Sequence, residues 1–210
     1  MSGMTDRLQS HRPRAIAINC TLKAKGESST DAMIAVLKEH FASNDVELTA
    51  TIRIAARNVK PGVTSDEGAG DGWPEIRAAI LDHDILVFGT PIWMGQISSV
   101  AKCVLERMDA FLSETDEAGR MPSTSKVAVA AIVGNEDGAH WASSQLFQSL
   151  NDTGWTIPSV AACYWVGEAM GDVDFKDLPH RPRKVQLTAA MVAANAAHLA
   201  GLLKRSPYPG

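Results

Sequence analysis

Two hydrophobic patterns alternate along the chain from residue 14 to residue 203. Short segments have apolar residues that are consecutive or alternate, as in strands. Longer segments have apolar residues every three or four positions, as in amphipathic helices. The first pattern predicts strands at 14–20, 46–52, 84–89, 126–133 and 157–166, the last shortened at its start by Pro158. The second predicts helices at 31–43, 98–112, 140–150 and 185–203, and a short helix that opens at Trp73-Pro74.

The predicted strands and helices follow one another in regular alternation. This order favours an α/β fold of three layers, in which a doubly wound parallel sheet carries helices on both faces. Five strands favour the flavodoxin-like fold with strand order 2-1-3-4-5. Residues 14–210 are expected to form this single domain, and residues 1–13 a flexible N-terminal extension. Polar stretches predict loops at 53–73, 90–96, 113–125 and 166–183.

Composition and charge narrow the possible functions. Of the 210 residues, 45% are hydrophobic and 21% are charged, as in a globular domain rather than a disordered chain. A net charge of −4 argues against a nucleic-acid partner. No apolar run approaches the roughly 20 residues of a membrane-spanning helix, so no membrane partner is expected. The N-terminal stretch lacks an apolar signal region, so a cytoplasmic location is expected.

The spacing of cysteines and histidines argues against a metal site. The three cysteines, at positions 20, 103 and 163, form no Cys-x-x-Cys motif. The six histidines include no pair at the i, i+4 spacing of a helical metal site. A disulfide framework, a cysteine-ligated zinc site and an iron–sulfur cluster are therefore not expected, and no metal ligand is predicted.

The loop after the first predicted strand is suited to an anion. Ligands of doubly wound sheets bind beyond the carboxyl ends of the strands. Here Ser28, Ser29 and Thr30 lie at a helix N-terminus, where free amides and the helix dipole attract negative charge, and Lys23 and Lys25 add positive charge. The loop matches neither a P-loop nor a G-x-G-x-x-G fingerprint, which favours a phosphate monoester. Simple N-capping by the same hydroxyl groups is the alternative.

The predicted loop at 90–96 is suited to a flat ring. Pro91 stiffens it, Gly95 lets a ligand approach the backbone, and Trp93 and Met94 can flank an aromatic system. The alternative is that Trp93 covers the core beneath a turn. The position at the carboxyl end of a strand favours a functional role.

The loop at 134–138 has a glycine at each end, and both suit the close approach of a ring. Asn135 offers an amide to the polar edge of such a ring. Glu136 and Asp137 are equally compatible with solvated turn residues. The next two polar or aromatic residues, His140 and Trp141, either touch a substrate or lie on the surface of a helix, and the second interpretation is favoured.

The run TPIWMGQISSVAKCVLERMD, at 90–109, resembles the NADPH-dependent FMN reductase group of flavodoxin-like proteins. Members show Thr-Pro, an aromatic residue, Gly-Ser, a further Ser, a Lys and an acidic-Arg ending. The loop at 134–138 is also similar to the corresponding loop of the family, and the resemblance covers roughly residues 14–167. The chain departs from the pattern at Trp93, where tyrosine is common, and at Gln96, where serine is common. Its first loop has lysines in place of an arginine.

The resemblance implies FMN as cofactor and NADPH or NADH as a transient co-substrate. It implies that the first loop surrounds the FMN phosphate, that the second lines the isoalloxazine ring, and that the third closes the other side. The residues implied are Thr21, Lys23, Ser28, Ser29 and Thr30; Pro91, Ile92, Trp93, Met94, Gly95 and Gln96; and Gly134, Asn135, Asp137 and Gly138. No side chain is predicted to be catalytic, because the flavin carries the redox chemistry. A small-molecule acceptor such as a quinone or a free flavin is expected, as is a homodimer or homotetramer.

Two other functions stay open. A flavodoxin-like electron-transfer protein would use the same site without oxidising NADPH, although a net charge of only −4 argues mildly against electrostatic docking to a redox partner. A non-catalytic binding protein would use the same sheet without flavin, since a fold does not determine function. NADPH consumption with a quinone separates the reductase from the electron-transfer protein. Flavin content separates both from the binding protein.

Overall fold

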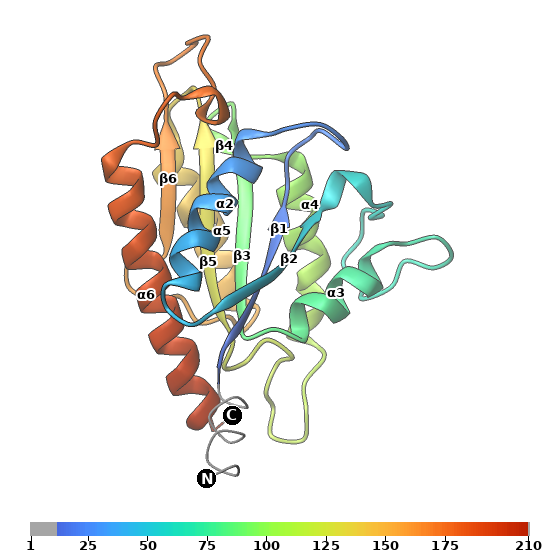
Figure 1. Cartoon of the computed structure of the whole chain (residues 1–210). Coiled ribbons are helices and arrows are strands. Elements are labelled where there is room, and N and C mark those ends of the chain that lie inside the picture. Colours follow the sequence, from blue (N-terminus) through green and yellow to red (C-terminus); the bar gives the residue numbers. More distant parts are fainter. Residues whose placement is uncertain (1–11, 210) are drawn as a thin grey trace.

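The computed structural model describes residues 12–209 as a single parallel sheet flanked by helices (Figure 1). The parallel strands lie in the order β2-β1-β3-β5-β6. This is the predicted order 2-1-3-4-5, because the short strand β4, which pairs only with β3, shifts the numbers of the last two strands by one. The predicted extension lies outside the described residues except for Arg12 and Pro13. The strands are β1 (Arg14–Asn19), β2 (Glu47–Arg53), β3 (Ile85–Trp93), β4 (Gln96–Ile97), β5 (Val127–Gly134) and β6 (Ala162–Val166).

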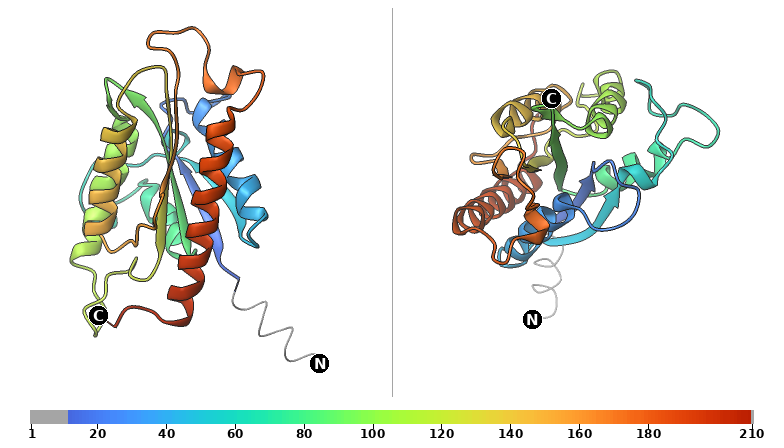
Figure 2. Two further views of the ribbon diagram at one scale, coloured as in Figure 1. Left: turned by 90° about the vertical axis from the view of Figure 1, so that its left-hand side faces the viewer. Right: turned by 90° about the horizontal axis from the view of Figure 1, so that it is seen from above.

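Helices cover both faces of the sheet in three layers (Figure 2). Helices α2 (Ser29–Ala42) and α6 (Arg183–Arg205) pack on one face. The other face is covered by α3 (Trp73–Leu81), α4 (Ser99–Met108) and α5 (Ala139–Asp152). Short 3-10 turns lie at Ile54–Ala56, Asp109–Leu112 and Phe175–Asp177.

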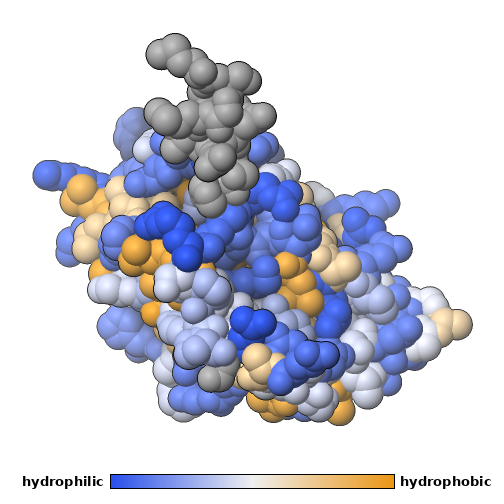
Figure 3. Space-filling model, turned by 90° about the horizontal axis from the view of Figure 1, so that it is seen from below, coloured by the Kyte–Doolittle hydropathy of each residue, from blue (hydrophilic) through white to orange (hydrophobic). Residues whose placement is uncertain are grey.

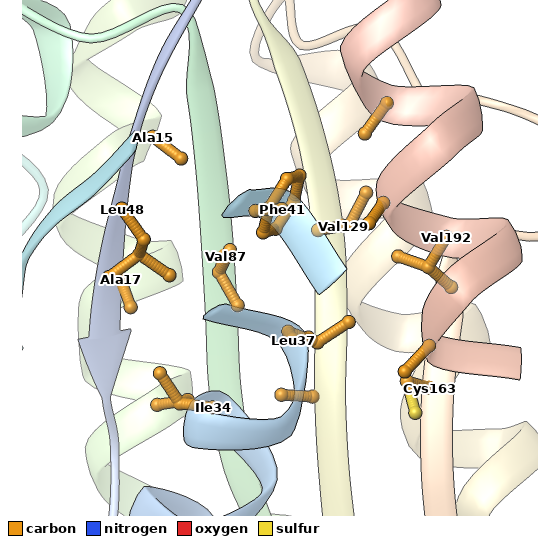
Figure 4. Packing of buried hydrophobic residues seen from close by; sticks show 14 of the residues in the cluster. Ala15, Ala17, Ile34, Leu37, Phe41, Leu48, Val87, Val129, Cys163 and Val192 are labelled. Carbon is orange, nitrogen blue, oxygen red and sulfur yellow. The ribbon is translucent and has the colours of Figure 1, made fainter. Parts of the chain in front are cut away.

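The central strands are buried on both sides, which explains why their sequences are almost wholly apolar. Seven of the eight residues of β5 are buried, and the eighth, Gly134 at the end of the strand, is partly exposed. Side chains of β1, β3 and β5 meet Ile34, Leu37 and Phe41 of α2 and Val192 of α6 (Figure 4). This packing holds the parallel strands in place, and with them the positions of their carboxyl ends at the upper edge of the sheet.

Helix α6 is 23 residues long and, among the described residues, is the one helix long and apolar enough to cross a membrane by length and composition. One face of it is buried against α2, β5 and β6, through Val185, Ala189, Val192, Ala196 and Leu203. This is the packing of a core helix in a layered domain.

The segment predicted as a loop at 90–96 is instead a β-hairpin. Strand β3 continues through Pro91 to Trp93, and β4 returns antiparallel to it, pairing Trp93 with Gln96. Met94 and Gly95 form the two-residue turn, with φ angles of 54° and 71°. Positive φ at both central positions is the signature of a type I′ hairpin turn. The sheet therefore has a sixth, antiparallel strand that the alternation of strands and helices did not predict.

The last strand begins at Ala162 and not at residue 157 as predicted. Before it, only Thr156 makes an isolated bridge, to Val127. Pro158 has no N–H to donate to the ladder, and Val160 has a φ of 54°, which takes the chain out of extended conformation. The predicted helix at 98–112 likewise changes to a 3-10 turn after Met108.

The long loop at 53–73 is anchored by a buried ion pair. Arg107 of α4 donates to the carboxylate of Asp71 at 2.7 Å, and both side chains are fully buried. Arg107 also donates to the Lys60 carbonyl at 2.9 Å. Burial raises the pKa of Asp71, but hydrogen bonds from the amides of Glu67, Trp73 and Lys60 and from Arg107 outweigh it and lower the pKa to about 2.

The lower end of the molecule, opposite the carboxyl ends of the strands, is mostly polar (Figure 3). Ion pairs join the chain there, with Arg14 to Asp82 at 2.9 Å and Lys204 to Asp84 at 3.0 Å. Apolar side chains appear in separate small patches in this view. The residues suited to a ligand lie at the other end.

Candidate functional site

Besides the loop after β2, the parallel sheet brings four loops to its upper edge (Figure 1). They are the loop after β1 at 20–28, the hairpin turn after β3, the loop after β5 at 134–138 and the loop after β6 at 167–182. The first three are the loops predicted from the sequence. In doubly wound sheets this edge is where ligands bind.

The loop after β1 ends at a capped helix with free donors. Ser28 is the N-cap of α2, and its Oγ accepts from the Asp31 amide at 3.1 Å. Its carbonyl accepts from the Ala32 amide. Of the first amides of α2, those of Ser29 and Thr30 have no partner among the described residues. These two amides and the helix dipole offer a place for a phosphate group.

A further positive charge reaches this loop from a distant part of the sequence. Arg53, at the end of β2, donates to the Gly26 carbonyl at 2.6 Å and pairs with Asp31, whose carboxylate also accepts from Ser28 Oγ at 2.8 Å. The predicted Lys23 and Lys25 are exposed. Arg53, Lys176 and Arg181 line a cavity of about 470 Å³ beside the N-terminus of α2. The sequence prediction missed all three because they come from segments far apart in the chain.

The hairpin turn is held by a carboxylate from the neighbouring loop. The two oxygens of Glu136 accept from the amides of Met94 at 3.1 Å and Gly95 at 2.9 Å. Consecutive turn amides of this kind form a concave site for an anion. Glu136, which the sequence left as a possible solvated turn residue, therefore joins two of the predicted loops.

Glycines bring the same two loops into backbone contact. A Cβ on Gly138 would lie 2.6 Å from the carbonyl oxygen of Gly95, so no larger residue fits there without a shift of the turn. Gly138 also has a φ of +116°, which side-chain-bearing residues rarely adopt. A Cβ on Gly134 would meet Ile92 at 2.8 Å. These contacts fix the distance between the loops predicted to enclose a ring.

Aromatic side chains are exposed along this edge. Trp93 is 53% exposed and Trp141 is 57% exposed. Gln96 Oε1 accepts from Trp141 Nε1 at 2.9 Å and from Gln145 Nε2 at 2.6 Å, which joins the hairpin to α5. Trp93 therefore does not cover the core, and its ring is available to a ligand.

The loop after β6 is fastened to Asn135. The side-chain Nδ2 of Asn135 donates to the Gly171 carbonyl at 3.1 Å and to Asp174 at 3.2 Å, and the backbone carbonyl of Asn135 accepts from the Met170 amide at 3.0 Å. Asn135 is thus engaged with protein groups. The sequence predicted a loop at 166–183 and the last strand beside the fourth, but not that this loop contacts Asn135, because those contacts depend on the conformation of the loop itself.

The structure brings most of the predicted residues to one edge but does not expose all their side chains. Ile92 is buried in the core on the α4 and α5 side, and Thr30 is 1% exposed. Only the backbone of these two residues can face a ligand. The free amides at the start of α2 fit the phosphate of FMN. The glycine contact between the hairpin turn and the loop at 134–138, with the exposed tryptophan rings beside it, fits the flat ring.

Comparison with known proteins places this arrangement in a family. The family model described as NADPH-dependent FMN reductase matches residues 13–169, the segment that holds all three predicted loops. The crystal structure of RosB with a bound 8-demethyl-8-formylriboflavin-5′-phosphate intermediate superposes with a TM-score of 0.84 at 26% identity, covering 94% of this chain and 82% of that one.

Two curated relatives also match. The 8-demethyl-8-aminoriboflavin-5′-phosphate synthase of Streptomyces davaonensis is 28% identical over 206 residues, covering 93% of this chain and 80% of the synthase. A protein of Mycobacterium bovis named divalent metal cation transporter MntH is 38% identical over 161 residues, or 74% of this chain. The match spans 23% of that protein's length.

Proposed function

The chain belongs to the NADPH-dependent FMN reductase family, and on that premise we propose that it transfers a hydride from NADPH or NADH to bound FMN and passes the electrons to a small acceptor such as a quinone. The chain is an FMN-dependent oxidoreductase, with FMN as cofactor and NAD(P)H as co-substrate. The observation that carries the proposal is the family match across the three loops that meet at the edge of the sheet.

The proposed FMN site follows the geometry of those loops. The amides of Ser29 and Thr30 and the hydroxyl of Ser29 would hold the phosphate, with Arg53 as the nearby cation. The hairpin turn and the loop at 134–138 would hold the ring. Trp93, exposed at the end of β3, would cover one side of it.

Bound FMN supplies the hydride and electron chemistry. The protein's part is to bind the phosphate, orient the ring and leave one face of it open to two substrates in turn. Glu136 fixes the turn that the ring would contact, through its hydrogen bonds to Met94 and Gly95. As in the sequence analysis, no side chain is proposed as an acid, base or nucleophile.

We also propose that the chain assembles into a homodimer or homotetramer. Helix α6 leaves Leu187 and Met191, one turn apart, exposed at 55% and 50%, and Leu202, three turns further on, exposed at 42%, and a second copy would cover these apolar side chains. Light scattering on the purified protein tests this. A monomer at all concentrations would contradict it.

The decisive experiment is a visible absorption spectrum of protein incubated with FMN and desalted, followed by NADPH without oxygen. A retained flavin spectrum that bleaches, and that recovers when a quinone is added, supports the reductase. A retained spectrum that does not bleach supports a flavodoxin-like electron-transfer role. If no flavin is retained, the proposed FMN site is wrong.

A second candidate function is chemistry on the flavin itself. It is favoured by the similarity to the Streptomyces davaonensis synthase, whose name describes a modified riboflavin phosphate. Mass spectrometry of the flavin recovered after turnover separates the two. Unchanged FMN supports the reductase, and a mass change at the ring supports flavin modification.

A further inference from the structure

A cavity of about 400 Å³ opens between the first turn of α5 and the end of β6. Its lining includes Asp137, His140, Trp141, Tyr164 and Val166. It begins where the loop at 134–138 ends. The volume lies within the range of about 300–1,000 Å³ that is usual for small-molecule sites.

The side chains that line this cavity are exposed although several are large and apolar. Tyr164 is 36% exposed and Val166 is 39% exposed. Cys163, next to Tyr164 in β6, points to the opposite face of the sheet and is fully buried in the core beside α2 and α6. Trp141 adds a ring held by its hydrogen bond to Gln96. Rings fixed in this way give a ligand apolar contact at low entropic cost.

His140 and Tyr164 form a hydrogen-bonded pair inside the cavity. His140 Nε2 lies 3.0 Å from the Tyr164 hydroxyl, and the two rings meet edge to face at 87° with centroids 5.4 Å apart. When Nε2 carries the proton and donates to the phenol oxygen, the phenol O–H is free to donate elsewhere. The pair then presents one oriented donor to a ligand in the cavity.

The cavity lies beside the proposed flavin site. Asp137 and Gly138 line it, and Gly138 is in contact with Gly95 of the hairpin turn. Trp141 joins the cavity to the same hairpin through Gln96. A compound bound here would therefore be close to the loops that would hold the ring of FMN.

We propose that this cavity binds the electron acceptor as a neutral, planar carbonyl compound of the quinone class, with Tyr164 donating a hydrogen bond to the carbonyl oxygen. The inference rests on the proposed function and assigns the acceptor a place. Within residues 12–209, no lysine or arginine lines the cavity, and Asp137 repels anions, so free FMN and anionic chelates are disfavoured as its ligands. His140 is a positioning residue, which acts by orienting the phenol.

The first test is equilibrium binding of menadione, a two-ring quinone, to the oxidised FMN-loaded protein in the absence of NADPH. Calorimetry should show one saturable site. Tyr164→Phe keeps the ring and removes one hydrogen bond, so it should weaken binding by about two- to tenfold. Tyr208→Phe is the matched control, because Tyr208 is the chain's other tyrosine and lies outside the cavity.

The second test separates acceptor binding from flavin reduction. In Tyr164→Phe, KM for menadione should rise by the same factor, while ferricyanide reduction and the rate of anaerobic bleaching by NADPH stay unchanged. Ferricyanide offers no carbonyl oxygen to bind. His140→Ala should behave like Tyr164→Phe, and His140→Gln, which keeps a side-chain N–H, should restore part of the affinity.

Two results would overturn the inference. One is equal menadione affinity in Tyr164→Phe and the unmodified protein, and the other is an equal loss with menadione and ferricyanide. If NADPH fails to bleach the flavin, the proposed function is wrong. The calorimetric titration would still decide whether the cavity binds a quinone, so the two failures are distinguishable.

Discussion

The carboxylate of Glu136 lies over the hairpin turn at Gly95, 41 residues away in the sequence, and accepts its amide hydrogen bond at 2.9 Å. The other carboxylate oxygen accepts from Met94, so one side chain satisfies both amides of the turn. Both turn residues have positive φ, which for methionine is an unfavourable conformation. Glu136 therefore stabilises the turn conformation that the proposed FMN site needs.

Replacing Glu136 by glutamine should weaken FMN binding by about tenfold. Glutamine can accept from only one of the two amides, and hydrogen bonds to a charged acceptor contribute about 1.5–3 kcal/mol each. Titration of FMN fluorescence against the protein measures the effect. Glu67→Gln is the matched control, because Glu67 also accepts from a backbone amide, that of Thr64 at 3.2 Å, but lies in the exposed loop at 53–73. Equal affinity in Glu136→Gln and Glu67→Gln would contradict the role.

Replacing Gly138 by alanine should both destabilise the protein and weaken FMN binding. The new Cβ would lie 2.6 Å from the Gly95 oxygen, and overpacking of this kind costs about 1–3 kcal/mol. Gly119→Ala is the control, because Gly119 also has positive φ, at +78°, but its Cβ would meet nothing within 4 Å. Urea unfolding separates the steric cost from the cost of positive φ. If both variants lose the same stability, the contact between the loops is unimportant.

The stability of the protein should fall as the pH drops from about 4 to about 2, partly through Asp71. Its pKa in the folded protein is lowered to about 2, so its contribution is complete above its ordinary pKa and is lost as the pH falls through the folded value. The contribution amounts to about 2 kcal/mol. Asp71→Asn should remove this part of the pH dependence, as urea unfolding at pH 2, 3, 4 and 6 would show.

The matched control for this prediction is Asp116→Asn. Asp116 also pairs with an arginine, Arg120 at 2.8 Å, but both side chains are largely exposed. An exposed pair contributes little to stability. A pH dependence that disappears in Asp116→Asn but persists in Asp71→Asn would show that the buried pair is not its source.

The parts of the fold that were predictable are those encoded by local patterns. The strands β1, β3 and β5 were found because burial on both faces demands continuous apolar runs. The hairpin was missed because Pro91 suggested a loop, and because Met94-Gly95 lacks the Asn-Gly or Asp-Gly sequence that usually marks a type I′ turn. Its geometry depends on a carboxylate from another loop.

The site was predictable to the same extent. The three loops follow from the rule that ligands bind beyond the carboxyl ends of parallel strands. Arg53 was missed although the predicted strand order places β2 beside β1, since that order gives neither the register of the two strands nor the direction of the Arg53 side chain, which reaches Gly26 and Asp31. The pairing of His140 with Tyr164 depends in the same way on α5 meeting β6. Contacts between residues 20 to 40 positions apart leave no periodic signal in a single sequence.

Replacing Ser28 by alanine should reduce the affinity for FMN more than the affinity for riboflavin, which lacks the phosphate. Ser28 caps α2, whose free amides would hold that phosphate, and the loss of an N-cap costs about 1 kcal/mol. Ser98→Ala is the control for the loss of a cap, because Ser98 caps α4 and accepts from the Ala101 amide. Its hydroxyl also donates to the Cys20 carbonyl at 2.7 Å, so Ser98→Ala should lose at least as much stability in urea as Ser28→Ala. Only Ser28→Ala should lower the ratio of FMN to riboflavin affinity, by roughly threefold to tenfold, because it alone disturbs the helix N-terminus proposed to bind the phosphate. An unchanged ratio in Ser28→Ala would contradict a phosphate site at the N-terminus of α2, and with it the part proposed for Arg53, which lines the same cavity as Ser28.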